Sequence, residues 1–195
     1  MIDVAAERAR AAGLDNIEFV QRDCEDLQFQ SRSYDAVTNA YGLMFCPDPR
    51  RALAEAHRVL VPDGRIALVT WDLPSQSAFF TVIRDVAAKF FVLRDPGPDE
   101  PNPFRFASAD MLRTMLDEAG FSSVHIDRLT MTFECDSVLD YCQIFKDYGW
   151  KSKIDALSSD DNARFHQTLT EAMRPYEGGG GWRLAATSLC VCAQQ

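Results

Sequence analysis

The sequence lacks the long apolar runs and basic runs that mark several protein classes. No segment approaches the roughly 20 consecutive apolar residues of a membrane span. The stretch "MIDVAAERARAAG" carries Asp3 and Glu7 without an apolar centre, so we expect neither a signal peptide nor a transit peptide there. The net charge is -9, and the longest basic run is the pair Arg50-Arg51. Because such a chain repels phosphate backbones, nucleic-acid binding is not expected.

Cysteine motifs for zinc or for a disulfide framework are also missing. None of the six cysteines forms C-x-x-C, and none has a histidine at zinc spacing, so we expect no metal site. Free cysteine behaves as a small buried hydrophobe, which predicts buried, reduced thiols in a reducing compartment, most simply the cytoplasm. The cysteines are Cys24, Cys46, Cys135, Cys142, Cys190 and Cys192.

What is present fits one α/β domain. The chain has 195 residues, of which 47% are hydrophobic and 25% charged, which are ordinary globular values. Strand-like runs alternate with helical patterns, which is typical of an α/β unit. Helices are expected over residues 1–12, 47–60 and 108–119, the last with Ser108 as its N-cap. The expected strands are 17–23, 34–40, 65–71, 121–134 and 182–193.

The expected strand 17–23 runs directly into an acidic cluster, Asp23-Cys24-Glu25-Asp26. Two readings are open. The cluster is either a solvated turn or a ligand site, because open α/β sheets bind ligands at the carboxyl ends of their strands.

Three phrases, in order, resemble the later two-thirds of a class I S-adenosylmethionine-dependent methyltransferase. The resemblance is to the type typified by the ubiquinone/menaquinone C-methyltransferases. It implies an α/β fold, with a partial Rossmann-like methyltransferase sheet, a C-terminal antiparallel hairpin and inserted helices. The phrases are "GLDNIEFVQRDCEDLQF", "SYDAVTNAYGLMFCPDPRRALAEAHRVLVPDGRIALVTW" and "MLRTMLDEAGF".

The resemblance also implies a division of one domain. Residues 1–72 form the cofactor side, and 73–107 and 136–177 are helical cap or insert regions. The C-terminal sheet is completed by 108–135 and 178–195.

The resemblance implies S-adenosylmethionine as cofactor and gives roles to six residues. The Asp23 carboxylate would accept the adenine amino group, and the Cys24 backbone N–H would donate to the adenine ring. Asn39 and Ala40 would lie beside the methionine part of the cofactor, although Asn39 fits a simple turn role equally well. Tyr41 and Trp71 would contact the substrate. No catalytic residue is identified, since the cofactor carries the reactive group.

Two elements of the family pattern are missing from this sequence. These are the Gly-rich loop after the first strand and the acidic residue that holds the cofactor ribose. We therefore expect a methyltransferase fold without its N-terminal part. The chain as given should bind the cofactor very weakly or not at all. The intact enzyme would methylate a small, apolar or aromatic molecule. The alternative is a non-catalytic remnant that acts as a binding or dimerising module, with the open edge of strand 34–40 pairing as a homo-oligomer.

Overall fold

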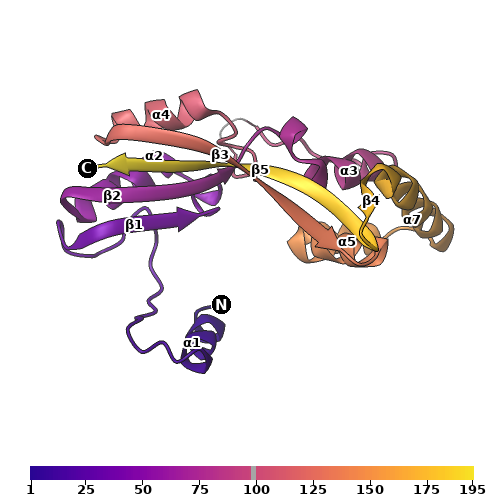
Figure 1. The fold of residues 1–195 in the computed structure, drawn as a ribbon, viewed down its shortest axis with the longest axis horizontal. Helices are drawn as coiled ribbons and strands as arrows, with labels where there is room; N and C mark the ends of the chain where they lie inside the picture. The colour runs from indigo at the N-terminus through magenta and orange to yellow at the C-terminus, as the bar shows by residue number, and fades with distance from the viewer. Residues whose placement is uncertain (98–99) are drawn as a thin grey trace.

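The computed structural model describes residues 1–97 and 100–195 and has a sheet at one end and a group of helices at the other (Figure 1). The strands β1 (Tyr34–Ala40), β2 (Leu60–Trp71), β5 (Gly181–Gln194) and β3 (Ser122–Cys135) lie side by side in that order. A short strand, β4 (Glu177–Gly178), pairs with the start of β5. The long strands β3 and β5 extend from the sheet to the helical end.

The strand directions match the expected fold class. β1 and β2 are parallel, whereas β5 runs antiparallel to both β2 and β3. A parallel part that ends in a C-terminal antiparallel hairpin is the predicted arrangement, and four of the five predicted strands are confirmed.

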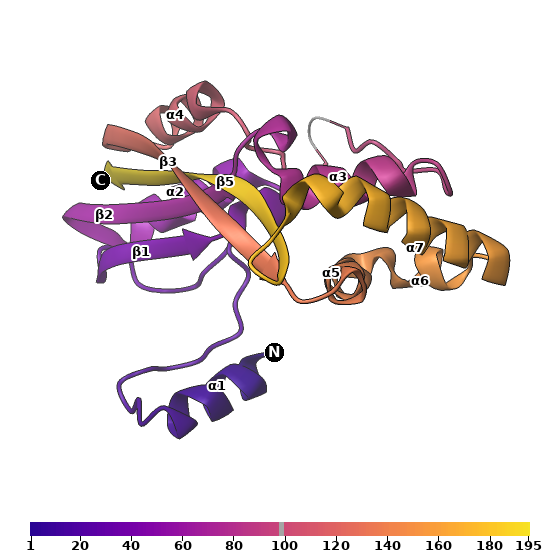
Figure 2. The same cartoon turned by 45° about the vertical axis from the view of Figure 1, so that its right-hand side comes forward.

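Most helices cover the sheet or build the helical end. Ser108 caps α4 as predicted, accepting a hydrogen bond from the backbone of Met111, and Asp48 caps α2. Figure 2 shows α3, α5, α6 and α7 grouped together, whereas α1 lies away from the sheet at the end of an extended segment. The α-helices are α1 (Ile2–Ala11), α2 (Pro49–Val59), α3 (Ala78–Ala87), α4 (Ala109–Glu118), α5 (Val138–Phe145), α6 (Lys151–Asp155) and α7 (Ser159–Met173). Shorter turns are η1 (Leu43–Phe45), η2 (Pro74–Gln76), the π-helical η3 (Lys146–Trp150) and η4 (Arg174–Tyr176).

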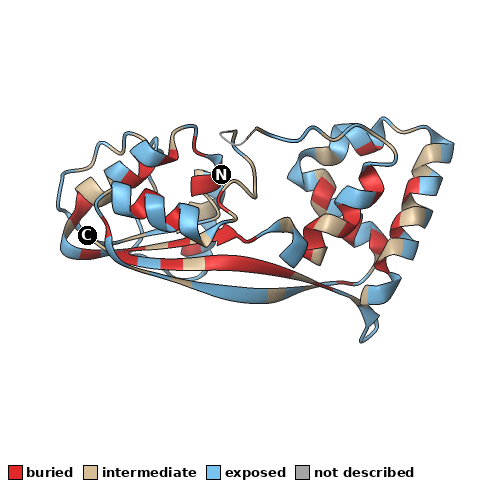
Figure 3. Cartoon of the chain, turned by 90° about the horizontal axis from the view of Figure 1, so that it is seen from above, coloured by how far each residue is buried: buried red, intermediate tan, exposed pale blue. Residues whose placement is uncertain are grey.

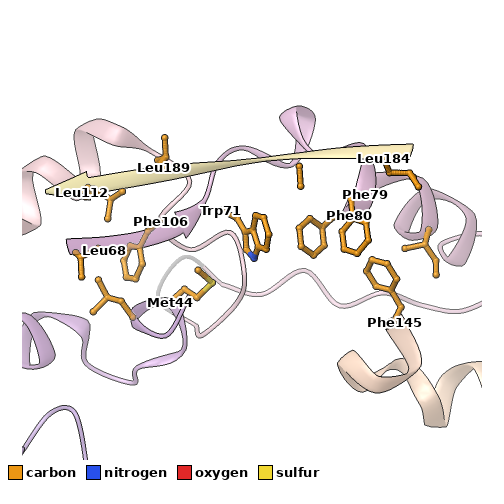
Figure 4. Packing of buried hydrophobic residues seen from close by; sticks show 14 of the residues in the cluster. Met44, Leu68, Trp71, Phe79, Phe80, Phe106, Leu112, Phe145, Leu184 and Leu189 are labelled. Atoms are coloured by element: carbon orange, nitrogen blue, oxygen red, sulfur yellow. The ribbon is translucent and has the colours of Figure 1, made fainter. Parts of the chain in front are cut away.

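One hydrophobic core joins the two ends of the molecule. Buried positions run through both the sheet end and the helical end (Figure 3). Trp71 at the end of β2 contacts Phe80 of α3 (Figure 4). Phe79 stacks on Phe133 and lies edge-on to Tyr141. Aromatic pairs of this kind add to the free energy of area burial, so the helical end is held to the sheet by rings from α3.

The predicted strand 17–23 is wrong. The segment is not a strand, and Ile17 and Val20 are 46% and 41% exposed. An extended segment becomes a strand only when another strand pairs with it. In the described part of the chain β1 pairs with β2 alone and forms the edge of the sheet. The only ladder pairing near this segment is a bridge between Asp23 and Asp26.

Candidate functional site

The acidic cluster forms a tight turn. The Asp23 carbonyl accepts the backbone N–H of Asp26 at 3.1 Å, and the Asp23 side chain accepts the N–H of Glu25 at 2.9 Å. Asp23 is exposed. Its carboxylate thus shapes the turn with one oxygen while the side chain faces solvent, where it can accept a further hydrogen bond.

This turn is anchored to α2 by hydrogen bonds in place of a sheet ladder. The Glu25 carboxylate accepts the backbone N–H of Asp48 at 2.7 Å, and Leu27 donates its N–H to Glu55 at 2.9 Å. A hydrogen bond from Arg58 lowers the pKa of Glu55, so this acceptor stays ionised. The turn at 23–26 is therefore positioned by the helix that follows β1.

The carboxyl end of β1 is shaped by Asn39. Its side-chain oxygen accepts the N–H groups of Gly42 at 3.1 Å and Leu43 at 2.9 Å, which closes the turn into η1. A Cβ on Gly42 would lie 3.0 Å from the Asn39 amide nitrogen, so the turn favours glycine there. Tyr41 adopts a left-handed φ of 56° within the same turn. The exposed Ala40 precedes it and pairs with Val69.

Tyr41 and Trp71 pack against each other where β1 and β2 end. Their rings are stacked with centroids 4.4 Å apart, and the Tyr41 hydroxyl lies 2.9 Å from the Ser188 hydroxyl on β5. Trp71 is only 6% exposed and its ring lies 4.8 Å from that of Phe80. The substrate contact predicted for Trp71 stays a prediction; in the structure it supports Phe80, which lines a cavity.

A cavity of about 590 Å³ opens next to these strand ends. Phe45 follows β1 and Pro74 follows β2, so the cavity lies at the carboxyl edge of the parallel strands. Aromatic residues and prolines make up most of its described lining, and its charged side chains are engaged in ion pairs, Arg84 with Asp95 and Arg94 with Glu100. The lining residues are Phe45, Pro74, Phe80, Arg84, Arg94, Asp95, Pro96, Asn102, Pro103, Phe104, Phe145, Tyr148 and Trp150.

The proline-rich loop, described over residues 94–97 and 100–106, closes one side of the cavity against η1. Asn102 donates its N–H to the Met44 carbonyl at 3.3 Å, and the Arg105 guanidinium donates to the Cys46 carbonyl at 2.6 Å. These contacts bring residues that are almost 60 positions apart in sequence into one wall. The sequence analysis included these residues in the cap region 73–107 and gave them no function.

A buried carboxylate that sequence reasoning missed lies directly after β2. Asp72 is 1% exposed, and its side chain accepts a hydrogen bond from Arg128 on β3 at 2.7 Å. It also accepts the Leu73 N–H at 2.8 Å. The sequence signal that could have indicated this site is an aspartate directly after the continuous apolar strand 65–71. The pair ties the end of β2 to the hairpin behind the cavity.

Five of the six predicted site residues meet around η1. Asn39, Ala40 and Tyr41 lead into it, Trp71 stacks on Tyr41, and the Cys24 sulfur lies 3.2 Å from the sulfur of Cys46, which follows η1. Asp23 lies beside Cys24 on the solvent side.

The expected burial of the cysteines is confirmed for three and wrong for the others. Cys46, Cys135 and Cys142 are buried, but Cys192 is exposed, and Cys24 and Cys190 are half-buried. Cys192 and Cys190 lie on the side of β5 away from the core, because alternate strand residues face opposite ways. In the described ranges 1–97 and 100–195, no cluster of three or more metal-binding side chains occurs. Across those same residues, no helix combines the length and apolar character that crossing a membrane requires.

Comparison with known proteins gives consistent matches. A family described as "Methyltransferase domain" matches residues 1–68. The ubiquinone/menaquinone biosynthesis C-methyltransferase UbiE of Rhizobium meliloti is 32% identical over 140 residues, which cover 67% of this chain and 54% of the relative. A demethylmenaquinone methyltransferase of Listeria monocytogenes is 31% identical over 133 residues, which cover 64% of this chain and 56% of the relative. The chain thus spans about half the length of the curated relatives it matches.

Solved structures agree at the level of the fold. The YcgJ protein of Bacillus subtilis superimposes with a TM-score of 0.61 at 18% identity, covering 100% of this chain and 78% of the other. The Haemonchus contortus phosphoethanolamine N-methyltransferase 2, solved with S-adenosyl-L-methionine, superimposes with a TM-score of 0.51 at 12% identity. The match covers 100% of this chain and 41% of the other. The strand order and these structures show the class I fold. With the family match and the sequence relatives, they place the chain among the S-adenosylmethionine-dependent methyltransferases.

Proposed function

We propose that this chain serves S-adenosylmethionine-dependent methyl transfer to a small, apolar or aromatic acceptor. The observation that carries the proposal is the aromatic cavity of about 590 Å³ at the carboxyl edge of β1 and β2. Its volume lies in the range of small-molecule sites. One sequence relative is named for ubiquinone/menaquinone biosynthesis and the other for demethylmenaquinone, which supports a ring as the acceptor.

The residues present fit the adenine end of S-adenosylmethionine. An exposed carboxylate at Asp23 and the neighbouring backbone N–H of Cys24 offer the acceptor and donor that an adenine edge needs. The turn that carries them is already anchored to α2. Asn39 has its side-chain oxygen occupied by two backbone N–H groups, so only its amide nitrogen is available to a ligand.

The role of the protein in the reaction is to position the acceptor and to exclude water. The cofactor, when bound, supplies an electrophilic methyl group. Phe80, Phe104 and Trp150 on the cavity wall would hold a flat acceptor and keep its reacting atom away from solvent. The Trp71 ring supports Phe80 from behind. No side chain is required as a nucleophile, and we assign none as a base.

Binding of a planar probe tests the acceptor cavity. 1-Naphthol should quench the fluorescence of Trp150 on binding. Tyr148 lines the cavity and is 54% exposed, so Tyr148→Asp should fold while weakening naphthol binding at least tenfold. Leu139→Asp is the matched control, because Leu139 is 64% exposed and does not line this cavity. Equal affinity in the two variants would refute the assignment of the cavity.

Transfer of a labelled methyl group from S-adenosylmethionine to a planar phenol tests the activity itself. We expect transfer at millimolar cofactor to be lost in Tyr148→Asp and kept in Leu139→Asp. The binding-module alternative is favoured by the unpaired edge of β1. It predicts no transfer in either variant and a concentration-dependent dimer in sedimentation velocity.

A further inference from the structure

Two thiols from separate segments meet beside the proposed adenine turn. The Cys24 sulfur, on the turn, and the Cys46 sulfur, directly after η1, are 3.2 Å apart although the residues are 22 positions apart in sequence. Cys46 is 6% exposed, whereas Cys24 is half-buried. A reagent from solvent therefore reaches Cys24 before Cys46.

The surroundings keep the inner thiol protonated. Burial raises the pKa of Cys46 to about 12, and the hydrogen bond and charge of the neighbouring Cys24 add to this effect. Thiolates, not thiols, attack disulfides. Cys24 is therefore the attacking thiol and Cys46 the resolving one. Once Cys24 is capped, its own contribution to the raised pKa of Cys46 disappears.

We propose that Cys24 and Cys46 form a reversible disulfide by exchange with a low-molecular-weight disulfide. The Cys24 thiolate attacks one sulfur of that disulfide, and the first small thiol leaves. Cys46 loses its proton to solvent and attacks the Cys24 sulfur, which releases the second small thiol. One molecule of reagent is reduced to two thiols, and the two cysteines lose two hydrogens in total.

The geometry permits this bond after a small movement. A disulfide is about 2.05 Å long, so the sulfurs must approach by about 1.2 Å. Cys46 is held by η1 and by the contact from Arg105, but the segment before Cys24 has no strand partner in the described structure. The turn at 23–26 can therefore supply the movement.

Disulfide formation would fasten the turn at 23–26 covalently to the connection between η1 and α2. Apart from the thiol contact itself, the described hydrogen bonds that hold this turn to the rest of the protein all go to α2 and its N-cap. A cross-link over a loop of this length constrains the unfolded chain. We expect the midpoint of thermal unfolding to rise by roughly 5 °C on oxidation. The bond itself does not depend on the proposed methyl transfer.

The experiment uses the folded chain carrying Cys190→Ser and Cys192→Ser, which removes the other accessible thiols. After treatment with oxidised glutathione, the count of titratable thiols should fall by two and the mass by two hydrogens. Trypsin cuts after Arg22, Arg32 and Arg50, so the bond should join peptides 23–32 and 33–50. Dithiothreitol should restore both peptides.

Two variants and a denatured sample act as controls. Cys46→Ser should stop at a glutathione adduct on Cys24, and Cys135→Ser should still form the cross-link. In urea the cross-link should lose its preference over other pairings. The proposal is overturned if the parent chain also stops at the Cys24 adduct, or if the linked peptides are absent while circular dichroism shows a folded protein. Alanine replacements repeat the test where a serine variant unfolds.

Discussion

Replacing Asn39 separates its role in the turn from a role in binding the cofactor. Asn39→Ala removes the oxygen that accepts the N–H groups of Gly42 and Leu43, at 3.1 and 2.9 Å. Each such hydrogen bond contributes about 0.5–1.5 kcal/mol, so we expect a loss of about 2 kcal/mol in the free energy of unfolding. For a chain of this size the melting midpoint should fall by roughly 4–8 °C.

Thermal unfolding followed by circular dichroism, without any ligand, is the assay. Asn39→Asp is the matched control, because a carboxylate oxygen can accept the same two hydrogen bonds and should lose less than half as much. If Asn39→Ala melts within about 1 °C of the parent chain, these hydrogen bonds do not stabilise the turn and the reasoning is refuted.

Three further predictions concern groups around the strand ends and in α7. Tyr41→Phe removes the hydrogen bond to Ser188 but keeps the stacked ring, so the free energy of unfolding should fall by about 1 kcal/mol in urea titrations; an unchanged midpoint would contradict the contact. Asp72→Ala should cost about 1–3 kcal/mol and Asp72→Asn less, because the amide oxygen can still accept and the charge of the 62% exposed Arg128 is screened; equal losses would mean that the lost charge accounts for the whole effect. Burial lowers the pKa of His166, so the unfolded chain binds more protons below pH 6.5 and stability should fall as the pH drops from 7 through that value; His166→Gln should flatten this dependence, and an unchanged slope would exclude the histidine as its source.

Elements set by local signals were predictable from the sequence. The helix after Ser108 begins with its capping side chain, and the strand predicted at 34–40 is observed at Tyr34–Ala40. Both follow from residues close together in the chain: a capping hydroxyl in one case and the strand formers Tyr34, Val37 and Thr38 in the other. The resemblance to the methyltransferases added the order of these elements, which no single phrase carries.

Features that depend on distant partners were not predictable. The run at 17–23 has the composition of a strand, but strand formation needs a neighbour, and β1 has none on that side in the described structure. The Asp72–Arg128 pair joins positions 56 apart. The cavity walls come from α3, the proline-rich loop and η3, so its existence depends on packing of the helical end against the sheet.

Saturation-transfer NMR with S-adenosylmethionine tests most directly whether the turn at 23–26 holds adenine. The method detects weak binding, which is what we expect of this chain. The adenine protons should receive more saturation than the methionine methyl protons. Asp23→Ala should abolish this difference, Asp23→Asn should keep part of it, and Asp26→Ala, which changes another acid of the same turn, should leave it intact. Even saturation across the cofactor, or an adenine signal that survives Asp23→Ala, would contradict the account.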